Sequence, residues 1–410
     1  MQDKATQPVD EGSTIKLVQE MDVFPVLPVE PPAKQPAPAL AAASPPSRWF
    51  MMKALQGTWP GVGMDTERVS ISGWTEASFT ASSVRDNQLP MGFNYLANQF
   101  ALQQNWLRVE RLVVTSGTSE PTFGFRADTI LPGTDYRFTM SRGLFSGQLS
   151  DNDGLPNTYG IDPVQFYGEA YFPTIGRGLD IKLGRMFCQY GAETIDAISN
   201  ILCSRSYAFI YDPFTHTGLM GTLYMTPAWS YQLGIIMGPD VFIDPAASPY
   251  SMFSVKWAPP GGRDSVLLSG IVGSGRFNEG RQFNNPNILD LVYIHTFSSR
   301  LTYTLDALAA YEINVPDIGT ATWFSTVHYL TYKFTPRLSG TTRLEFFDDV
   351  DGNRTGFKGL YTTGTAGVNF QLRPDIIFRP ELRYDYNGAS KPFQDKHGLF
   401  TAAADVIVRW

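Results

Sequence analysis

The sequence predicts an all-β protein, a transmembrane antiparallel β-barrel of about sixteen strands with short periplasmic turns and long extracellular loops. Segments of about ten residues recur from residue 69 onward, long enough for a tilted strand to cross a bilayer. Apolar and polar residues alternate along these segments. The links between them alternate between short, turn-forming ones and longer ones. A soluble β-sandwich has no reason to sort its links in this way.

The composition fits a membrane barrel and narrows the class of protein. Charged residues make up 17% of the 410 residues, against about 25% in soluble proteins, and aromatic residues make up 13%. No run of about eighteen apolar residues occurs, so the sequence offers no candidate transmembrane helix. The formal net charge of −7 argues against a nucleic-acid partner.

The N-terminal part has a different texture from the rest of the chain. Residues 1–47 are first polar and then proline-rich, which predicts a flexible, extended segment. The first residues lack the features of a signal peptide, and we expect that such a peptide has been removed, because a barrel reaches an outer membrane only after export. Residues 48–68 are expected to form a short helical or irregular element before the barrel. This element either packs at the end of the barrel or contacts a periplasmic partner.

The last segment, residues 397–410, shows the strand pattern most clearly. Its apolar face carries Phe400, Ala402, Ala404, Val406, Val408 and Trp410. Its other face carries Thr401, Ala403, Asp405, Ile407 and Arg409. An amphipathic strand that ends on an aromatic residue is typical of the closing strand of an outer-membrane barrel, with the apolar face toward lipid. We expect the barrel assembly machinery to bind the chain through this strand.

The predicted barrel domain, residues 69–410, has a charged inner face. Charges on the polar side of each strand suit a water-filled lumen, because an arginine facing hydrocarbon costs about 2–4 kcal/mol near the midplane. The candidate pore-lining residues are Glu76, Arg108, Glu110, Arg126, Asp128, Glu169, Asp180, Lys182, Asp306, Arg343, Glu345, Arg379, Glu381, Arg383, Asp385 and Arg409. Acids slightly exceed bases in this set, which indicates a weak cation preference. Pro380 lies within a strand, and we expect a bulge or local distortion there.

The longer links are expected at residues 81–104, 132–163, 188–217, 238–249, 275–287, 314–320, 348–360 and 387–397. The link 188–217, between the fifth and sixth strands, contains both cysteines, Cys188 and Cys203. The spacing of its isoleucines predicts a short amphipathic helix over residues 192–201. An exported chain with two cysteines favours a disulfide between them, worth about 3 kcal/mol in the chain-entropy model. The alternative is two free thiols.

Four motifs carry a resemblance to a known family. They are SISGWTEASFT at residues 70–80, LGRMF at 183–187, GAETIDAISN at 191–200 and SRSYAFIYDPFTHTG at 204–218. Together they resemble the beta-barrel porin-2, or OmpL-like, family over residues 65–410. The resemblance implies an outer-membrane porin of a Gram-negative-type envelope, through which small hydrophilic solutes or ions diffuse passively. It leaves the proline-rich segment unmatched and defines no substrate.

General porins suggest a role for the link between the fifth and sixth strands, because in them this link folds into the barrel and narrows the pore. By this resemblance, the charged residues of the constriction loop would be Glu193, Asp196, Arg205 and Asp212. The alternative is an extracellular loop that faces outward. Outer-membrane lipid and the permeating solutes are the expected partners, and a homo-oligomer is possible by analogy with general porins.

Residues for catalysis or metal binding form no recognisable pattern. The four histidines have no zinc-ligand spacing, and neither a Gly-x-Ser-x-Gly elbow nor a phosphate-binding loop occurs. We therefore expect no enzyme activity, no metal and no cofactor. The alternative to an open porin is a structural or adhesion barrel with a plugged lumen. A soluble all-β protein is the third possibility.

Overall fold

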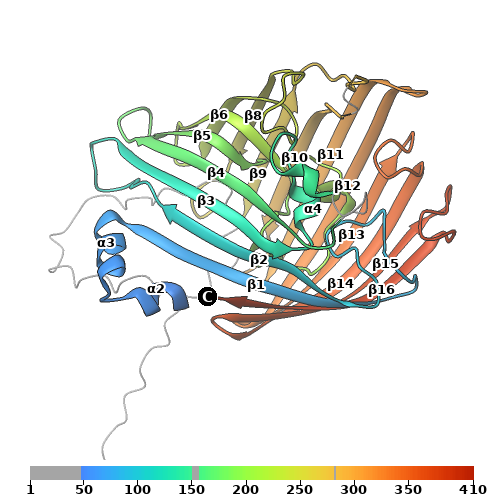
Figure 1. Ribbon diagram of the computed structural model, residues 1–410, viewed down its shortest axis with the longest axis horizontal. Helices are drawn as coiled ribbons and strands as arrows, with labels where there is room; N and C mark the ends of the chain where they lie inside the picture. The colour runs from blue at the N-terminus through green and yellow to red at the C-terminus, as the bar shows by residue number, and fades with distance from the viewer. Residues whose placement is uncertain (1–47, 150–156, 281–282) are drawn as a thin grey trace, which may run out of the picture.

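The computed structural model describes residues 48–149, 157–280 and 283–410, and the predicted proline-rich segment 1–47 lies outside these described residues. Within the described part of the chain, sixteen antiparallel strands form one closed barrel (Figure 1). Each strand pairs with its neighbours in the chain, and β1 closes the barrel by pairing with β16. The predicted fold class and the predicted number of strands are therefore confirmed.

All sixteen strands lie within residues 69–410, the predicted barrel domain. They are β1 (Val69–Ser82), β2 (Phe100–Arg111), β3 (Thr122–Gly133), β4 (Gly160–Phe172), β5 (Leu179–Phe187), β6 (Thr215–Tyr224), β7 (Trp229–Ile236), β8 (Tyr250–Trp257), β9 (Asp264–Val272), β10 (Asn287–Thr296), β11 (Leu301–Val315), β12 (Gly319–Thr335), β13 (Leu338–Asp349), β14 (Gly359–Arg373), β15 (Ile376–Asn387) and β16 (Gly398–Arg409). The helices are α2 (Phe50–Leu55), α3 (Trp59–Glu67), α4 (Tyr136–Thr139) and α5 (Tyr207–Ile210).

The outer surface of the barrel is apolar and the inner surface is polar. On β15, Leu382 is 55% exposed on the outside, whereas its neighbours Glu381 and Arg383 are buried inside. On β16, Phe400 faces outward and Asp405 inward, as the alternation predicts. Among the residues that the structure describes, no helix is long and apolar enough to span a membrane. Alternation of this kind is what a strand between lipid and lumen requires.

One link departs from the predicted alternation of short and long connections. The link between β11 and β12 is expected to be one of the longer ones, but these strands pair as far as Val315 and Gly319. Residues 316–318 alone remain between them. β11 and β12 are the longest pair in the described barrel, so the wall itself extends where a loop was expected.

Pro380 disturbs the sheet on one side only. Between β14 and β15 the pairs Gly367–Glu381 and Phe370–Phe378 share one register, but no pair is formed between them. On the other side, Pro380 pairs with Ala404 of β16 without interruption. A proline has no N–H to donate, so the ladder breaks locally while the strand continues. The predicted local distortion is present, without a bulge at this point.

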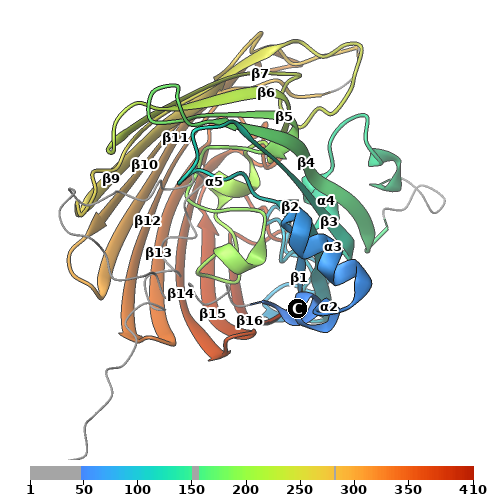
Figure 2. The same ribbon diagram turned by 90° about the vertical axis from the view of Figure 1, so that its left-hand side faces the viewer.

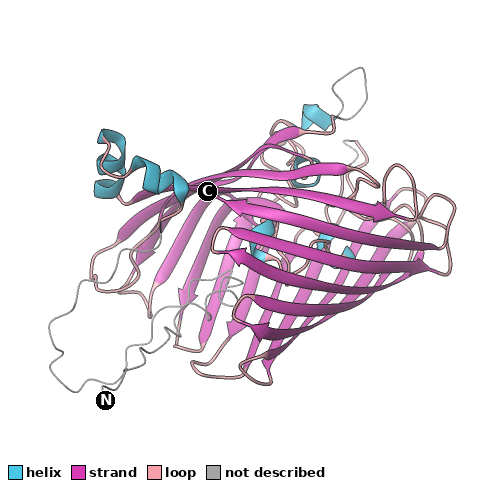
Figure 3. Ribbon diagram, turned by 90° about the horizontal axis from the view of Figure 1, so that it is seen from below, coloured by secondary structure: helices cyan, strands magenta, loops and turns pink. Residues whose placement is uncertain are grey.

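Two helices precede the barrel, where the sequence predicted one. Thr58 is the N-cap of α3, and Pro60 and Gly61 lie in its first turn. The hydroxyl of Thr58 accepts a hydrogen bond from the Gly61 N–H at 3.2 Å, and a proline fits the first helical turn because its missing N–H is not needed there. Both helices lie at the end of the barrel where β1 starts (Figure 3). The Ile71 N–H, in β1, donates to the Met52 sulfur at 3.3 Å.

The apolar outer surface leads to a prediction about stability in a membrane. Leu382→Arg should lower the free energy of unfolding by about 2–4 kcal/mol, because the substitution places a charge in mid-strand against lipid. Leu372→Arg, an outward position beside the turn to β15, should cost about 0–1 kcal/mol. Urea unfolding of the protein refolded into lipid vesicles measures both values. Equal costs for the two variants would contradict the assignment of the outer face.

Candidate functional site

Residues 188–214, which connect β5 to β6, form a loop inside the barrel, called the inner loop here. Figure 2, a view along the barrel from the end with α2 and α3, shows α5 and its loop surrounded by the strands. Hydrogen bonds join the inner loop to side chains of β2, β10, β11, β13 and β15. The outward-facing alternative for this link is therefore wrong.

Three arginines of the barrel wall hold the main chain of the inner loop. The hydrogen bonds to loop carbonyls run from Arg343 of β13 to Ser204 at 2.8 Å, from Arg379 of β15 to Ala197 at 2.8 Å and Asn200 at 2.6 Å, and from Arg383 of β15 to Arg205 at 2.5 Å. A loop without regular structure leaves its carbonyls without ladder partners, and a guanidinium supplies several donors to satisfy them. These three residues are called the loop-binding arginines below.

Each loop-binding arginine also has a carboxylate partner. The ion pairs join Arg343 to Glu193 at 2.8 Å, Arg379 to Asp405 at 2.5 Å and to Glu76 at 3.2 Å, and Arg383 to Asp385 at 2.7 Å. The three guanidinium groups are at most 1% exposed. Buried charges of this kind are tolerated only when they are paired, and removal of one partner costs about 3–5 kcal/mol.

Carboxylates on the wall bind the N–H groups of the same loop. The bonds run from Gly191 to Asp290 at 2.9 Å, from Ala192 to Asp306 at 2.7 Å, from Ser204 to Glu381 at 3.2 Å and from Ala208 to Glu345 at 2.9 Å. Asp290 was not predicted as a residue of the inner face, although it lies on that face of β10 with Ile288 and Val292. Gln104 donates to the carbonyl of Ile195 at 2.7 Å and accepts from the Ala197 N–H at 3.0 Å. It was not predicted either, because the prediction of inner-face residues considered charged side chains.

The helix predicted over residues 192–201 does not form. Only Ala197–Ser199 makes a single 3-10 turn. Asn200 donates to the carbonyls of Thr194 and Asp196, both at 2.8 Å, and the Ser199 hydroxyl donates to the Asp196 carboxylate at 2.7 Å. Short polar side chains that bind nearby backbone compete with helical hydrogen bonds, and here they prevail over the apolar spacing.

The disulfide predicted between Cys188 and Cys203 is also wrong, because both thiols are free. The Cys188 sulfur lies 3.9 Å from the carbonyl of Tyr190, and the Cys203 sulfur lies 3.8 Å from the amide nitrogen of Asn94. Each cysteine therefore packs against different groups. Burial raises the pKa of both thiols, so they stay protonated and weakly reactive near neutral pH.

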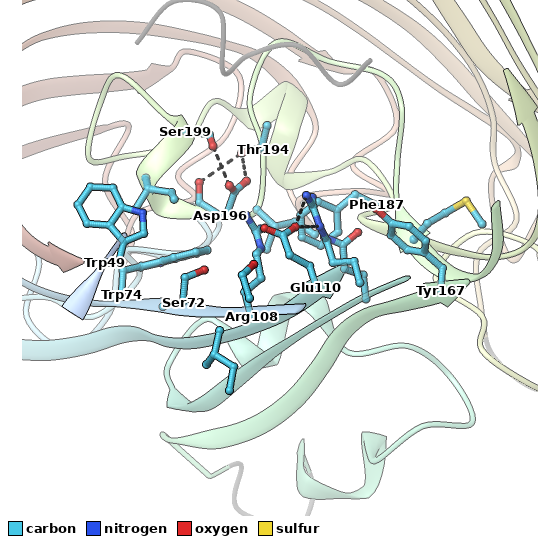
Figure 4. A pocket seen from close by; sticks show the side chains of 18 of the residues that line it. Trp49, Ser72, Trp74, Arg108, Glu110, Tyr167, Phe187, Thr194, Asp196 and Ser199 are labelled. Carbon is cyan, nitrogen blue, oxygen red and sulfur yellow. Dashed lines mark hydrogen bonds and ion pairs between the residues drawn. The ribbon is translucent and has the colours of Figure 1, made fainter. Parts of the chain in front are cut away.

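A cavity of about 990 Å³ lies between the inner loop, the wall formed by β1–β5 and the helices α2 and α3. This inner cavity contains a row of ion pairs on the wall: Arg108 with Asp128 at 2.8 Å, Arg126 with Glu110 at 2.6 Å, and Lys182 with Glu169 at 3.4 Å and Asp180 at 3.6 Å. Figure 4 shows Asp196 of the loop on the opposite side of the cavity from Arg108 and Glu110. The cavity therefore places fixed charges on two facing walls.

The predicted lumen residues divide into two groups. The group at the inner cavity comprises Arg108, Glu110, Arg126, Lys182 and Arg409, which line it, with Asp128, Glu169 and Asp180 as ion-pair partners. The group beneath the inner loop comprises Glu76, Asp306, Arg343, Glu345, Arg379, Glu381, Arg383 and Asp385. The four predicted loop residues are all buried; Glu193 and Asp196 line the cavity, whereas Arg205 and Asp212 are not among its lining residues. That any of them contacts a solute stays a prediction.

A second cavity, of about 420 Å³, lies at the opposite end of the barrel among the long links. Arg142, Pro213, Asp240, Phe283 and Arg354 are among the residues that line this outer cavity. The Asp240 carboxylate accepts hydrogen bonds from the N–H groups of Phe214 at 2.8 Å and Thr215 at 2.9 Å. Burial raises the pKa of Asp240 to about 6. The two hydrogen bonds act in the opposite direction and lower the pKa, but burial has the larger effect.

The closed sixteen-stranded barrel has the fold of outer-membrane porins. The chain belongs to the beta-barrel porin-2, OmpL-like family, whose sequence model matches residues 68–409. The family and the fold indicate a channel rather than an enzyme. The protein is a porin of the outer membrane, and small solutes and ions pass through it by diffusion.

Solved outer-membrane proteins share the fold at low sequence identity. An anion-selective porin from Comamonas acidovorans is 10% identical, with a TM-score of 0.53 over 83% of this chain and 99% of that one. A loop-deletion mutant of OmpT from Vibrio cholerae is 8% identical, with a TM-score of 0.56 over 83% and 99%. The channel DcaP of Acinetobacter baumannii is 11% identical, with a TM-score of 0.52 over 83% and 96%. No curated protein sequence gives a match.

The raised pKa of Asp240 predicts a dependence of stability on pH. A carboxyl that binds its proton more tightly in the folded state stabilises the fold most at low pH, and this contribution is lost as the pH rises from about 4 to 6. Relative to Asp240→Asn, the wild-type free energy of unfolding should fall by about 3 kcal/mol over that range. Urea unfolding at several pH values measures the difference. Parallel pH profiles would rule out the effect.

Proposed function

We propose that the inner loop narrows the channel and that solutes pass on its β1–β5 side, through the inner cavity. The observation that carries this proposal is the attachment of the loop to β13 and β15 by the loop-binding arginines. These bonds occupy the opposite side of the lumen with buried, paired charge. A diffusing ion then meets the row of ion pairs on β2–β5 and the facing carboxylate of Asp196.

The elements around the barrel take supporting roles in this proposal. Trp49, Met52 and Met64 line the inner cavity, which favours a packing role at the channel mouth for residues 48–68. We keep as proposals the assembly of the barrel through β16, a homo-oligomeric state and the absence of catalysis.

A channel that is closed in the described conformation is the second candidate, in line with the plugged barrel considered from the sequence. The observation that favours it is the burial of apolar side chains inside the barrel. Met220, Met252 and Ile271 are at most 2% exposed. Single-channel recording distinguishes the two candidates, because an open porin conducts steadily whereas a plugged barrel is silent.

Loosening the loop tests its role in narrowing the channel. Arg343→Met removes the ion pair with Glu193 and the bond to Ser204, which should cost about 3–5 kcal/mol locally and free this part of the loop. We expect a larger or noisier single-channel conductance in planar bilayers. Arg337→Met, at an exposed turn residue, is the matched control. An unchanged conductance in a folded Arg343→Met protein would refute the narrowing role.

Charge reversal tests the proposed route. Lys182→Glu places a third carboxylate beside Glu169 and Asp180, so the cavity should attract cations more strongly. The reversal potential in a salt gradient should shift toward the cation equilibrium potential, and the weak cation preference expected from the sequence should increase. Arg300→Glu, on an exposed turn, should leave it unchanged at moderate salt, where exposed charges are screened. Identical shifts in the two variants would argue against the route.

A further inference from the structure

The inner and outer cavities approach each other at the beginning and end of the inner loop. Cys188 and Tyr190, at its beginning, line the inner cavity. Pro213, at its end, and Asp240 of the link between β7 and β8 line the outer cavity. Residues that line different cavities therefore lie side by side in this part of the loop.

Direct contacts join the two sets of lining residues. The Tyr190 hydroxyl donates to the carbonyl of Pro213 at 3.2 Å. The Cys188 N–H donates to the carbonyl of Phe214 at 2.9 Å, and Phe214 in turn donates to the Asp240 carboxylate. Tyr190, which lines the cavity of about 990 Å³, and Pro213, which lines the cavity of about 420 Å³, are thus in direct contact.

The Tyr190 side chain is the part of this partition that a substitution can remove. Pro213 contributes its carbonyl, and the N–H groups of Phe214 and Thr215 donate to the Asp240 carboxylate, so these contacts do not depend on the side chains of Pro213, Phe214 and Thr215. Tyr190 is 3% exposed, and its hydroxyl also lies 3.0 Å from the Nε2 atom of His216. Its ring is part of the apolar cluster inside the barrel, with Met186 and Met220.

We propose that the ring of Tyr190 is the septum of the channel, the group that narrows the connection between the two cavities and limits conductance. The proposal rests on the proposed function, since it places the narrowest point within the inner loop. The solutes concerned are small hydrated ions, because both cavities carry charged side chains from the loop or the wall. Tyr190 acts by volume and position, and not as a charged selectivity group.

The test compares single-channel conductance of four refolded proteins in planar bilayers. Tyr190→Ala should raise the conductance at least about twofold over wild type, because the ring that separates the cavities is gone. Tyr190→Phe should raise the conductance less than Tyr190→Ala does, because it removes the hydroxyl that contacts Pro213 but keeps the ring. Tyr207→Ala is the matched control: Tyr207 belongs to the same loop and is fully buried, but it packs against Phe347 and Tyr361 and lines neither cavity. An equal increase in both alanine variants, or none in either, would overturn the septum.

A second measurement uses a thiol placed on the inner side of the septum. In a Cys188→Ser, Cys203→Ser background, Ser72→Cys introduces a thiol on the wall of the inner cavity, and a membrane-impermeant maleimide added from the side of the long links should label it in Tyr190→Leu but not with Tyr190 present. Tyr190→Leu keeps an apolar side chain and serves if Tyr190→Ala does not fold. Absence of labelling in a folded Tyr190→Leu protein would overturn the proposal.

The outcomes for the septum and for the proposed function are distinct. If the wild type conducts like a porin and Tyr190→Ala does not change its conductance, the septum proposal fails. The proposal of a porin that is narrowed elsewhere then remains. If wild type and Tyr190→Ala are both silent, although folded, and Arg343→Met is silent too, the narrowed-channel proposal fails together with the septum. An increase confined to Tyr190→Ala supports both.

Discussion

The structure depends on the hydrogen bonds between the loop-binding arginines and the main chain of the inner loop. The barrel wall alone would enclose a wide lumen, because sixteen strands form a ring too large for side chains to fill. Arg343, Arg379 and Arg383 convert a free connection into a fixed internal wall. The position of the inner cavity and the contact of Tyr190 with Pro213 follow from where the loop is held.

This arrangement pairs the buried arginines inside the barrel with carboxylates. Each loop-binding arginine has a carboxylate within 2.8 Å, and the wall of the inner cavity repeats the pattern with Arg108 and Arg126. Isolated charges at these buried positions would cost several kcal/mol each. Charged residues on the inner face can therefore line a water-filled cavity, or they can be buried in ion pairs and hydrogen bonds beneath the inner loop. The same residue types occur in both places. This is why inward orientation alone does not identify a pore-lining residue.

The strands could be predicted from sequence because a barrel wall imposes a local rule, the alternation between lipid and lumen. That rule predicted the number of strands and placed charges such as Arg383 and Asp385 on the inner face. The loop follows no local rule. Its bonds reach across more than ninety residues, as from Ala197 to Gln104, and side chains such as Asn200 override the helical spacing. The same lack of a local signal explains why a disulfide was expected between thiols that pack apart.

The anchors of the inner loop hold mostly its backbone and not its side chains. The loop-binding arginines donate to carbonyls of the loop, and Asp290, Asp306 and Glu345 accept from its N–H groups. Every residue has a backbone carbonyl, and every residue except proline has a backbone N–H. Substitutions along the loop can therefore alter the groups that face the cavity without releasing the loop from the wall. Groups on β10–β15 therefore fix the path of the loop, and the side chains that face the inner cavity set its charge without determining that path.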